Sequence, residues 1–270
     1  MNGSGGAAAM ALTLVMAFEP AAMADDRLDL LYRVTVRVTG DREETRIPAI
    51  PLGFVLAAQK ITGNPDVAAN PGFAEFAAKS TGMVWSYTYH DRMFGRPIHD
   101  EQGTRDRPFD LTLQFDSHMM NDALKAMGEK PWPVPRPQLG VVVAVKDMVR
   151  SYLLAEGAER GSDQRAAFGD ASERFAIPVI FPAESDLVAA GVTLENMDTA
   201  SPDALRILKE KAHVDALLFG QLEWNKAEQG WTGTWHLPEN PQSEVWSIHG
   251  VNFDAAFRNA VGGAAKRLRP

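Results

Sequence analysis

Cysteine is absent from this 270-residue sequence. Its absence excludes a disulfide framework, a thiolate zinc site and lipid attachment through a cysteine. Basic residues are fewer than acidic ones: the chain has 27 lysines and arginines and 35 aspartates and glutamates, which gives a formal net charge of −8. The longest basic cluster is the KRLR sequence at residues 266–269. We therefore expect no nucleic-acid partner.

The short motifs of several common enzyme classes are missing too. The chain contains no G-x-S-x-G hydrolase elbow, no G-x-x-x-x-G-K-[ST] phosphate-binding loop and no H-E-x-x-H zinc motif. A glycine pair occurs at residues 262–263, but it lies inside a helical pattern and predicts no phosphate site. We expect no cofactor, and the sequence favours a protein that is not an enzyme.

Residues 1–24 differ from the rest of the chain. Residues 7–18 form an apolar run of twelve, and Ala22 and Ala24 place small side chains where a secretory signal peptide is cleaved. A helix of that length spans only about 18 Å, short of the ~30 Å hydrocarbon core, so we expect no stable transmembrane segment after cleavage. No lysine or arginine precedes the run, however, and a retained anchor is the alternative. The pattern predicts cleavage after Ala24 and a periplasmic location.

The chain is organised around residues 132–147, WPVPRPQLGVVVAVKD. Together with Pro131, the prolines predict a stiff connector, because proline cannot continue a helix and favours extended geometry before it. Arg136 within it is expected to anchor the connector to the first half. Residues 139–145 carry no polar side chain, which is typical of a strand covered on both faces. The predicted divisions are the signal peptide at residues 1–24, an N-terminal half at 25–130, the connector at 131–137 and a C-terminal half at 138–270.

Hydrophobic periodicity predicts an α/β (α+β) fold of two similar mixed-sheet halves with helices packed on the sheets. Residues 28–39 alternate between apolar and polar side chains, as a half-exposed strand does. Residues 52–61 show helical spacing, with prolines before them and Gly63 after them. The C-terminal half ends in a strand meander followed by a terminal helix. The remaining predicted strands lie at residues 83–89, 109–115, 177–181, 214–223, 231–237 and 245–249, and the remaining helices at 71–81, 117–128, 162–175, 202–212 and 254–268.

A polar segment at residues 90–107 carries the best candidates for metal ligands. His90 and Asp91 lie at its start and His99 and Asp100 lie further along it, so a hairpin would bring two imidazole–carboxylate pairs together. Two imidazoles and a carboxylate are sufficient ligands for a catalytic metal. Turn-forming polar residues also collect in loops without any such role. The segment therefore predicts a metal site only as an alternative.

Tryptophans cluster on the predicted meander, where each strand carries at least one: Trp224, Trp231, Trp235 and Trp246. Aromatic faces on a sheet can stack on a sugar or on a partner protein, which makes these four residues candidate binding residues. Burial beneath the terminal helix is the simpler interpretation. An earlier stripe of Trp85, Tyr87 and Tyr89 is likewise typical of a strand face that packs in a core.

A set of structural motifs runs through most of the mature chain: Trp132 with Arg136-Pro137, ASERFAIPVIFP at residues 171–182, VDALLFGQLEW at 214–224 and GWTGTWHL at 230–237. Together with Ile61-Thr62-Gly63, these motifs resemble the bacterial domain-of-unknown-function family 2066. The resemblance implies an exported protein of Gram-negative bacteria with no established activity, ligand or catalytic residues. It therefore supplies no site residues.

The leading hypothesis is an exported, non-enzymatic protein of the cell envelope that acts as a protein-binding or assembly scaffold. The lack of a catalytic constellation motivates it, and a protein in the envelope is the expected partner. One alternative is a metal-dependent hydrolase that uses the loop at residues 90–101. The other is a glycan-binding module that uses the tryptophan-rich C-terminal sheet. The sequence names no ligand and no oligomeric state.

Overall fold

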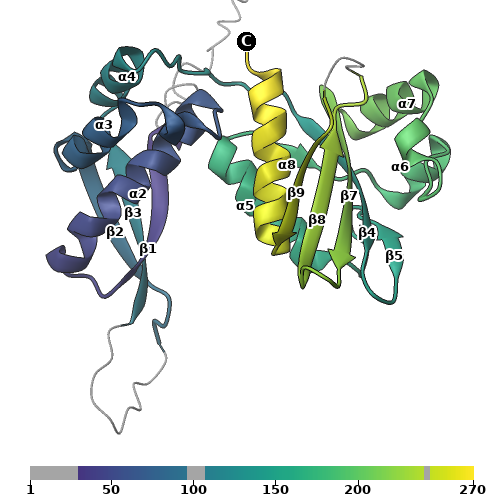
Figure 1. Cartoon of the computed structure of the whole chain (residues 1–270), viewed down its shortest axis with the longest axis horizontal. Coiled ribbons are helices and arrows are strands. Elements are labelled where there is room, and N and C mark those ends of the chain that lie inside the picture. The colour runs from purple at the N-terminus through teal and green to yellow at the C-terminus, as the bar shows by residue number, and fades with distance from the viewer. Residues whose placement is uncertain (1–29, 96–106, 240–243) are drawn as a thin grey trace, which may run out of the picture.

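The structure, a computed structural model, describes residues 30–95, 107–239 and 244–270. It contains two β-sheets with helices packed on them, one in each half of the chain (Figure 1). The predicted α/β class is confirmed, including the C-terminal strands and the terminal helix. The segment expected to be a signal peptide lies outside the described residues. None of the helices that the structure describes combines the length and the apolar character needed to span a bilayer.

The first half is a three-stranded antiparallel sheet covered by helices. Its elements are β1 (Arg33–Thr39), α2 (Glu43–Thr62), α3 (Phe73–Lys79), β2 (Val84–Asp91), β3 (Pro108–Phe115) and α4 (Ser117–Ala126). The strand order is β1-β3-β2. The valines of β1 are buried in a core that they share with α2, whereas the arginines and threonines between them are exposed. This alternation is the one that the sequence predicts for a half-exposed strand.

Helix α2 begins at Glu43, well before the predicted range of 52–61, and it continues through Pro48 and Pro51. An interior proline removes a backbone hydrogen bond and clashes with the preceding turn, so the start was expected after these residues. The helix tolerates them because it buries a long apolar stripe against the sheet. The core side chains of that stripe are Ile50, Phe54, Ala57, Ala58 and Ile61. Tertiary packing thus overrides the local rule.

Helix α2 ends at Gly63, whose φ of +66° lies in the left-handed region. A Cβ atom there would lie 2.5 Å from the ring of Trp132. We expect Gly63→Ala to lower the free energy of unfolding by about 2–4 kcal/mol, because backbone strain and a clash combine. Urea unfolding measures the change. Gly128→Ala is the matched control, since Gly128 has a φ of +76° and no atom within 4 Å of an added Cβ; equal losses in both variants would contradict the role of Trp132.

The second half is a six-stranded mixed sheet between two helical layers. Its elements are β4 (Leu139–Lys146), β5 (Ser151–Leu153), α5 (Ser162–Phe175), β6 (Val179–Ile180), α6 (Glu184–Ala189), α7 (Pro202–Ala212), β7 (Ala216–Asn225), β8 (Gly230–His236), β9 (Trp246–Val251) and α8 (Phe253–Leu268). The strands follow the order β5-β4-β7-β8-β9, and β6 also pairs with β4. Strand β4 is parallel to β6 and β7, and the other pairs are antiparallel. The predicted meander is formed by β7, β8 and β9.

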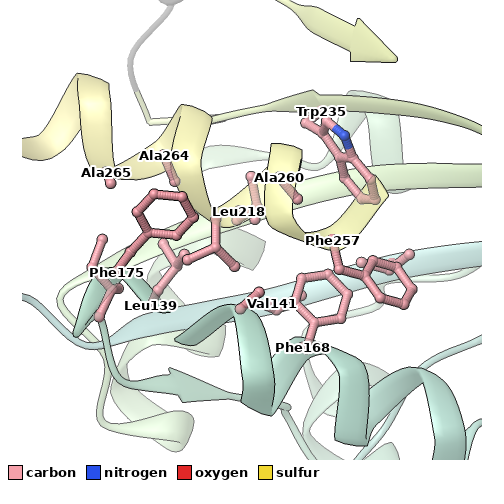
Figure 2. Packing of buried hydrophobic residues seen from close by; sticks show 14 of the residues in the cluster. Leu139, Val141, Phe168, Phe175, Leu218, Trp235, Phe257, Ala260, Ala264 and Ala265 are labelled. Carbon is pink, nitrogen blue, oxygen red and sulfur yellow. The ribbon is translucent and has the colours of Figure 1, made fainter. Parts of the chain in front are cut away.

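The core of the second half lies between the sheet and helices α5 and α8 (Figure 2). Small residues on α8, such as Ala260 and Ala264, let its axis approach α5 and the sheet. Phe168 of α5 stacks on Phe257 of α8 with ring centroids 4.1 Å apart. Helices α6 and α7 cover the other face of β4 and β7. Strand β4 is therefore buried on both faces, as its apolar sequence predicts.

Arg136 joins the two halves and is only 5% exposed. Its guanidinium donates to the carbonyl oxygens of Lys60 at 2.7 Å and Ile61 at 2.9 Å, both in the last turn of α2. It also donates to Trp132 O at 2.8 Å and to the carbonyl of Phe175, which ends α5. Carbonyls at helix C-termini lack intrahelical partners and carry partial negative charge. Burial lowers the pKa of Arg136 to about 10, so the group stays charged at neutral pH.

Candidate functional site

Strand β2 forms the outer edge of the first sheet. It pairs with β3 on one side, and within the described residues no strand pairs with its other side. In Figure 1 this free edge lies on the side of the first half that faces away from the second half. The residues from Trp85 to Thr88 are all exposed, which shows that helices α2, α3 and α4 leave this part of the strand uncovered. The strand thus offers a long accessible edge.

The backbone of β2 directs half of its polar groups outward. Arg92 N–H donates to the Pro108 carbonyl at 3.2 Å. From this hydrogen-bonded pair, every second residue back along β2, as far as Ser86, belongs to a hydrogen-bonded pair with β3. In an antiparallel pair the residues of such hydrogen-bonded pairs face the neighbouring strand, while those between them face away. The N–H and C=O groups of Tyr87 and Tyr89 therefore point to the free edge, whereas Trp85 lies at the register shift, where the alternation is broken. These groups are available to an added strand.

The aromatic side chains of β2 are more exposed than their alternating pattern predicts. Trp85 is 76% exposed and lies at the register shift between Val84 and Ser86, which frees it from the core-facing row. Tyr87 is 45% exposed, and the guanidinium of Arg46 lies 4.1 Å from its ring centroid. The expectation that this stripe packs in a core is wrong for Trp85, because β2 is an edge strand and a bulge displaces the side chain.

The metal candidates lie at the end of β2. His90 is exposed, and Asp91 accepts a hydrogen bond from Met93 N–H at 2.8 Å and one from Arg107 at 2.9 Å. These two contacts hold the pKa of Asp91 below its ordinary value, the backbone bond being the larger cause. Across the described ranges, no group of three or more possible ligands could hold a metal ion. His99 and Asp100 lie outside the described residues, so the metal site stays a prediction.

The four tryptophans of the meander all lie on the face of the sheet that α8 covers. The register pairs Trp224 with Trp231 and Trp235 with Trp246, and cross-strand partners share a face. Trp235 is fully buried, with its ring edge-on to Phe257 at 6.2 Å, so it cannot contact a glycan here. Each of the other three is partly buried.

These three tryptophans remain partly accessible without forming an open aromatic platform. Trp224 and Trp231 meet edge to face at 5.4 Å near the turn between β7 and β8. Trp246 donates from Nε1 to the Asn259 carbonyl at 3.1 Å, and Arg267 lies 4.1 Å from its ring centroid. These contacts tie Trp246 to α8. A flat stacking surface for sugar rings would need exposed, coplanar faces instead.

A family model described as "Domain of unknown function (DUF8605)" matches residues 27–133. The resemblance to family 2066 is therefore wrong, because the matching family is a different domain of unknown function. The misleading motifs lie mostly after residue 133, where apolar strands such as β4 and β7 have sequences that many buried strands share. The matched stretch contains the whole first sheet, including β2. No curated protein and no solved structure matches the chain.

Proposed function

We propose that the chain is an exported, non-enzymatic protein of the cell envelope that binds an extended segment of a partner protein along the free edge of β2. The single observation that supports the proposal is the outward direction of the backbone groups of Tyr87 and Tyr89 on an unpaired edge. An added strand forms main-chain hydrogen bonds with such groups, and side-chain pockets provide specificity. The function is thus a contact rather than a reaction.

The side chains of β2 favour strand addition over a protected edge. Natural edge strands are shielded by charge, by proline, by short length or by a covering element. Strand β2 has eight residues, and from Val84 to Tyr89 it carries neither a charged residue nor a proline. The bulge beside Trp85 is one protective feature, and it also presents that indole to a partner. Tryptophan is among the side chains that are enriched at binding hot spots.

The other strand edges are less suited to this role. Lys60 Nζ donates to the Arg33 carbonyl at 3.1 Å and so occupies part of the β1 edge. Strand β5 has three residues, which is too few for a stable added pair. Strand β9 has six residues, and Trp246 and Ile248 pack against the core beneath α8. Strand β2, with eight residues, is the longest of these edge strands.

Photo-crosslinking tests the proposal. A photoreactive residue replaces Trp85 in the full chain, which is then exposed to envelope extract and irradiated. We expect discrete adducts with one or a few proteins, and no such adducts when the same group replaces Lys211, an exposed residue of α7. Identical adducts at both positions, or none at position 85, would count against the proposal.

The backbone contribution is tested by Tyr87→Pro. Proline removes the outward N–H of residue 87 but none of the bonds to β3, so we expect the fold to be retained. We expect the adduct yield at position 85 to fall about tenfold, which corresponds to ~1.4 kcal/mol for a lost hydrogen bond and the clash of the ring. Tyr87→Ala is the control, because it removes the phenol and keeps the N–H. Equal losses in the two variants would indicate side-chain contact without strand addition.

Metal analysis separates this proposal from the hydrolase alternative. We expect purified protein, dialysed against zinc and then against buffer, to retain less than one equivalent of metal per chain. Asp91 already pairs with Arg107 at 2.9 Å, which competes with any cation for the carboxylate. Stoichiometric zinc that disappears in a His90→Ala, His99→Ala double variant would replace our proposal with the hydrolase.

A further inference from the structure

A cleft of about 240 Å³ lies between the two halves, apart from the β2 edge. Its walls come from β1 and α2 of the first half and from α5 and α8 of the second. The apolar part is formed by Val34 and Leu56, with Thr35 beside them. The rest of the lining is charged. The space exceeds that of a bare ion, since a water-sized group needs about 30 Å³.

Three cations from three different helices line the cleft: Lys60 of α2, Arg174 of α5 and Arg258 of α8. Lys60 is 8% exposed, and burial lowers its pKa. Burial and the nearby charge of Arg258 lower the pKa of Arg174. Positive charges held close together in a partly desolvated space repel one another, and this repulsion destabilises the folded protein when no anion is bound.

These cations have few partners within the protein. Lys60 Nζ donates to the Arg33 carbonyl at 3.1 Å, and Arg174 Nε donates to Gln59 Oε1 at 3.1 Å. Within the part of the chain that the structure describes, neither they nor Arg258 form an ion pair with a carboxylate. Most of their donor groups are thus free for a ligand. The chain as a whole has more carboxylates than basic groups and a net charge of −8. The excess of positive charge in the cleft is therefore local.

Two acidic side chains, Asp170 and Glu173, also line the cleft, and both residues are exposed. Glu173 acts on Lys60 at longer range and raises its pKa, although burial outweighs this effect. The local balance of the lining is three positive charges against two negative ones. Because both carboxylates are exposed, solvent screens their charge, and they reduce the affinity for an anion without neutralising the buried Lys60.

The geometry points to a binding site for a small organic or inorganic oxyanion, carboxylate or phosphate, held by Lys60, Arg174 and Arg258 across the two halves. Guanidinium groups match the paired oxygens of either anion, and the lysine adds a point charge at the buried end. The apolar wall at Val34 and Leu56 would contact the carbon part of a carboxylate ligand. An anion bound there would draw α2, α5 and α8 together. The site is independent of strand addition at β2.

Thermal unfolding of the full chain tests the site with two probes, inorganic phosphate and succinate, at an ionic strength kept constant with sodium chloride. A ligand that binds only the folded state raises the unfolding temperature in a saturable manner. We expect saturation with at least one probe in the wild-type protein. The probe that acts at the lower concentration distinguishes a phosphate-type ligand from a carboxylate-type one.

Arg258→Gln is the decisive variant, because Arg258 is exposed and we expect its replacement to leave the fold intact. We expect the apparent Kd for the effective probe to rise at least about tenfold, since one charge-assisted contact is lost. Arg206→Gln is the matched control: Arg206 is an exposed arginine of α7 that pairs with Glu210 at 3.0 Å, and its variant should bind as wild type does.

A substitution of opposite sign sharpens the test. Asp170→Asn removes a negative charge from the rim, and we expect it to tighten probe binding about threefold through reduced repulsion. No saturable rise with either probe, or a rise that Arg258→Gln leaves unchanged, would overturn the proposal. Arg174→Gln provides a second cleft variant, and its effect should match that of Arg258→Gln in direction.

Discussion

Replacing Arg136 by methionine is expected to lower the free energy of unfolding by about 3–5 kcal/mol, the cost of removing one member of a buried charged network. The side chain is 5% exposed and holds carbonyl oxygens from both halves. Methionine has a comparable length but no donor, so it leaves Lys60 O, Ile61 O and Phe175 O with fewer partners in a dry environment. Buried carbonyls without donors are costly because water cannot reach them.

Urea unfolding of Arg136→Met measures this loss, and hydrogen exchange locates it. We expect amides near the ends of α2 and α5 to lose protection before those of β4, because Arg136 connects these two helix ends. Arg136→Lys should show an intermediate loss, since an ammonium keeps the charge but forms fewer fixed bonds. Arg150→Met is the control for an exposed arginine. A midpoint shift no larger than that of the control would show that the junction does not depend on Arg136.

Much of the fold was predictable because hydrophobic periodicity depends on local sequence. The valine run of β4 and the helix of α8 follow their patterns closely. Other features needed tertiary structure, as in the passage of α2 through Pro48 and Pro51. Gly262 within α8 is another case: local propensity disfavours glycine there, but an added Cβ would lie 2.8 Å from the Phe175 ring. The need for that glycine becomes visible only when α5 packs against α8.

The candidate sites were less predictable, because each depends on how distant segments meet. The alternation of β2 is the same for a core strand and for an edge strand, and only the order β1-β3-β2 distinguishes them. The cations of the cleft, Lys60, Arg174 and Arg258, lie on separate helices and share no motif. Arg136 was expected to contact the first half, and the structure adds its bond to Phe175 of the second. The spacing of residues along the sequence does not show which distant segments come into contact.

The core between α5 and α8 depends on Phe257, and Phe257→Ala is expected to lower the free energy of unfolding by about 3–5 kcal/mol. Phe257 is fully buried, stacks on Phe168 at 4.1 Å and meets the Trp235 ring at 6.2 Å. Truncation removes buried apolar area and leaves a cavity beside Phe168 and Trp235, whose rings flank Phe257 (Figure 2). The expected loss therefore combines a transfer term with a cavity term.

Phe94→Ala is the matched control for this prediction, because it is the same chemical change at a side chain that is 85% exposed. We expect it to alter stability by less than about 0.5 kcal/mol, as surface substitutions usually do. Urea unfolding followed by tryptophan fluorescence is suitable, since Trp235 contacts the truncated site. A loss below about 1 kcal/mol for Phe257→Ala would mean that α8 shifts to close the cavity. In that case the position of Arg258, one residue further along α8, would also be adaptable, and the anion cleft would tolerate ligands of several sizes.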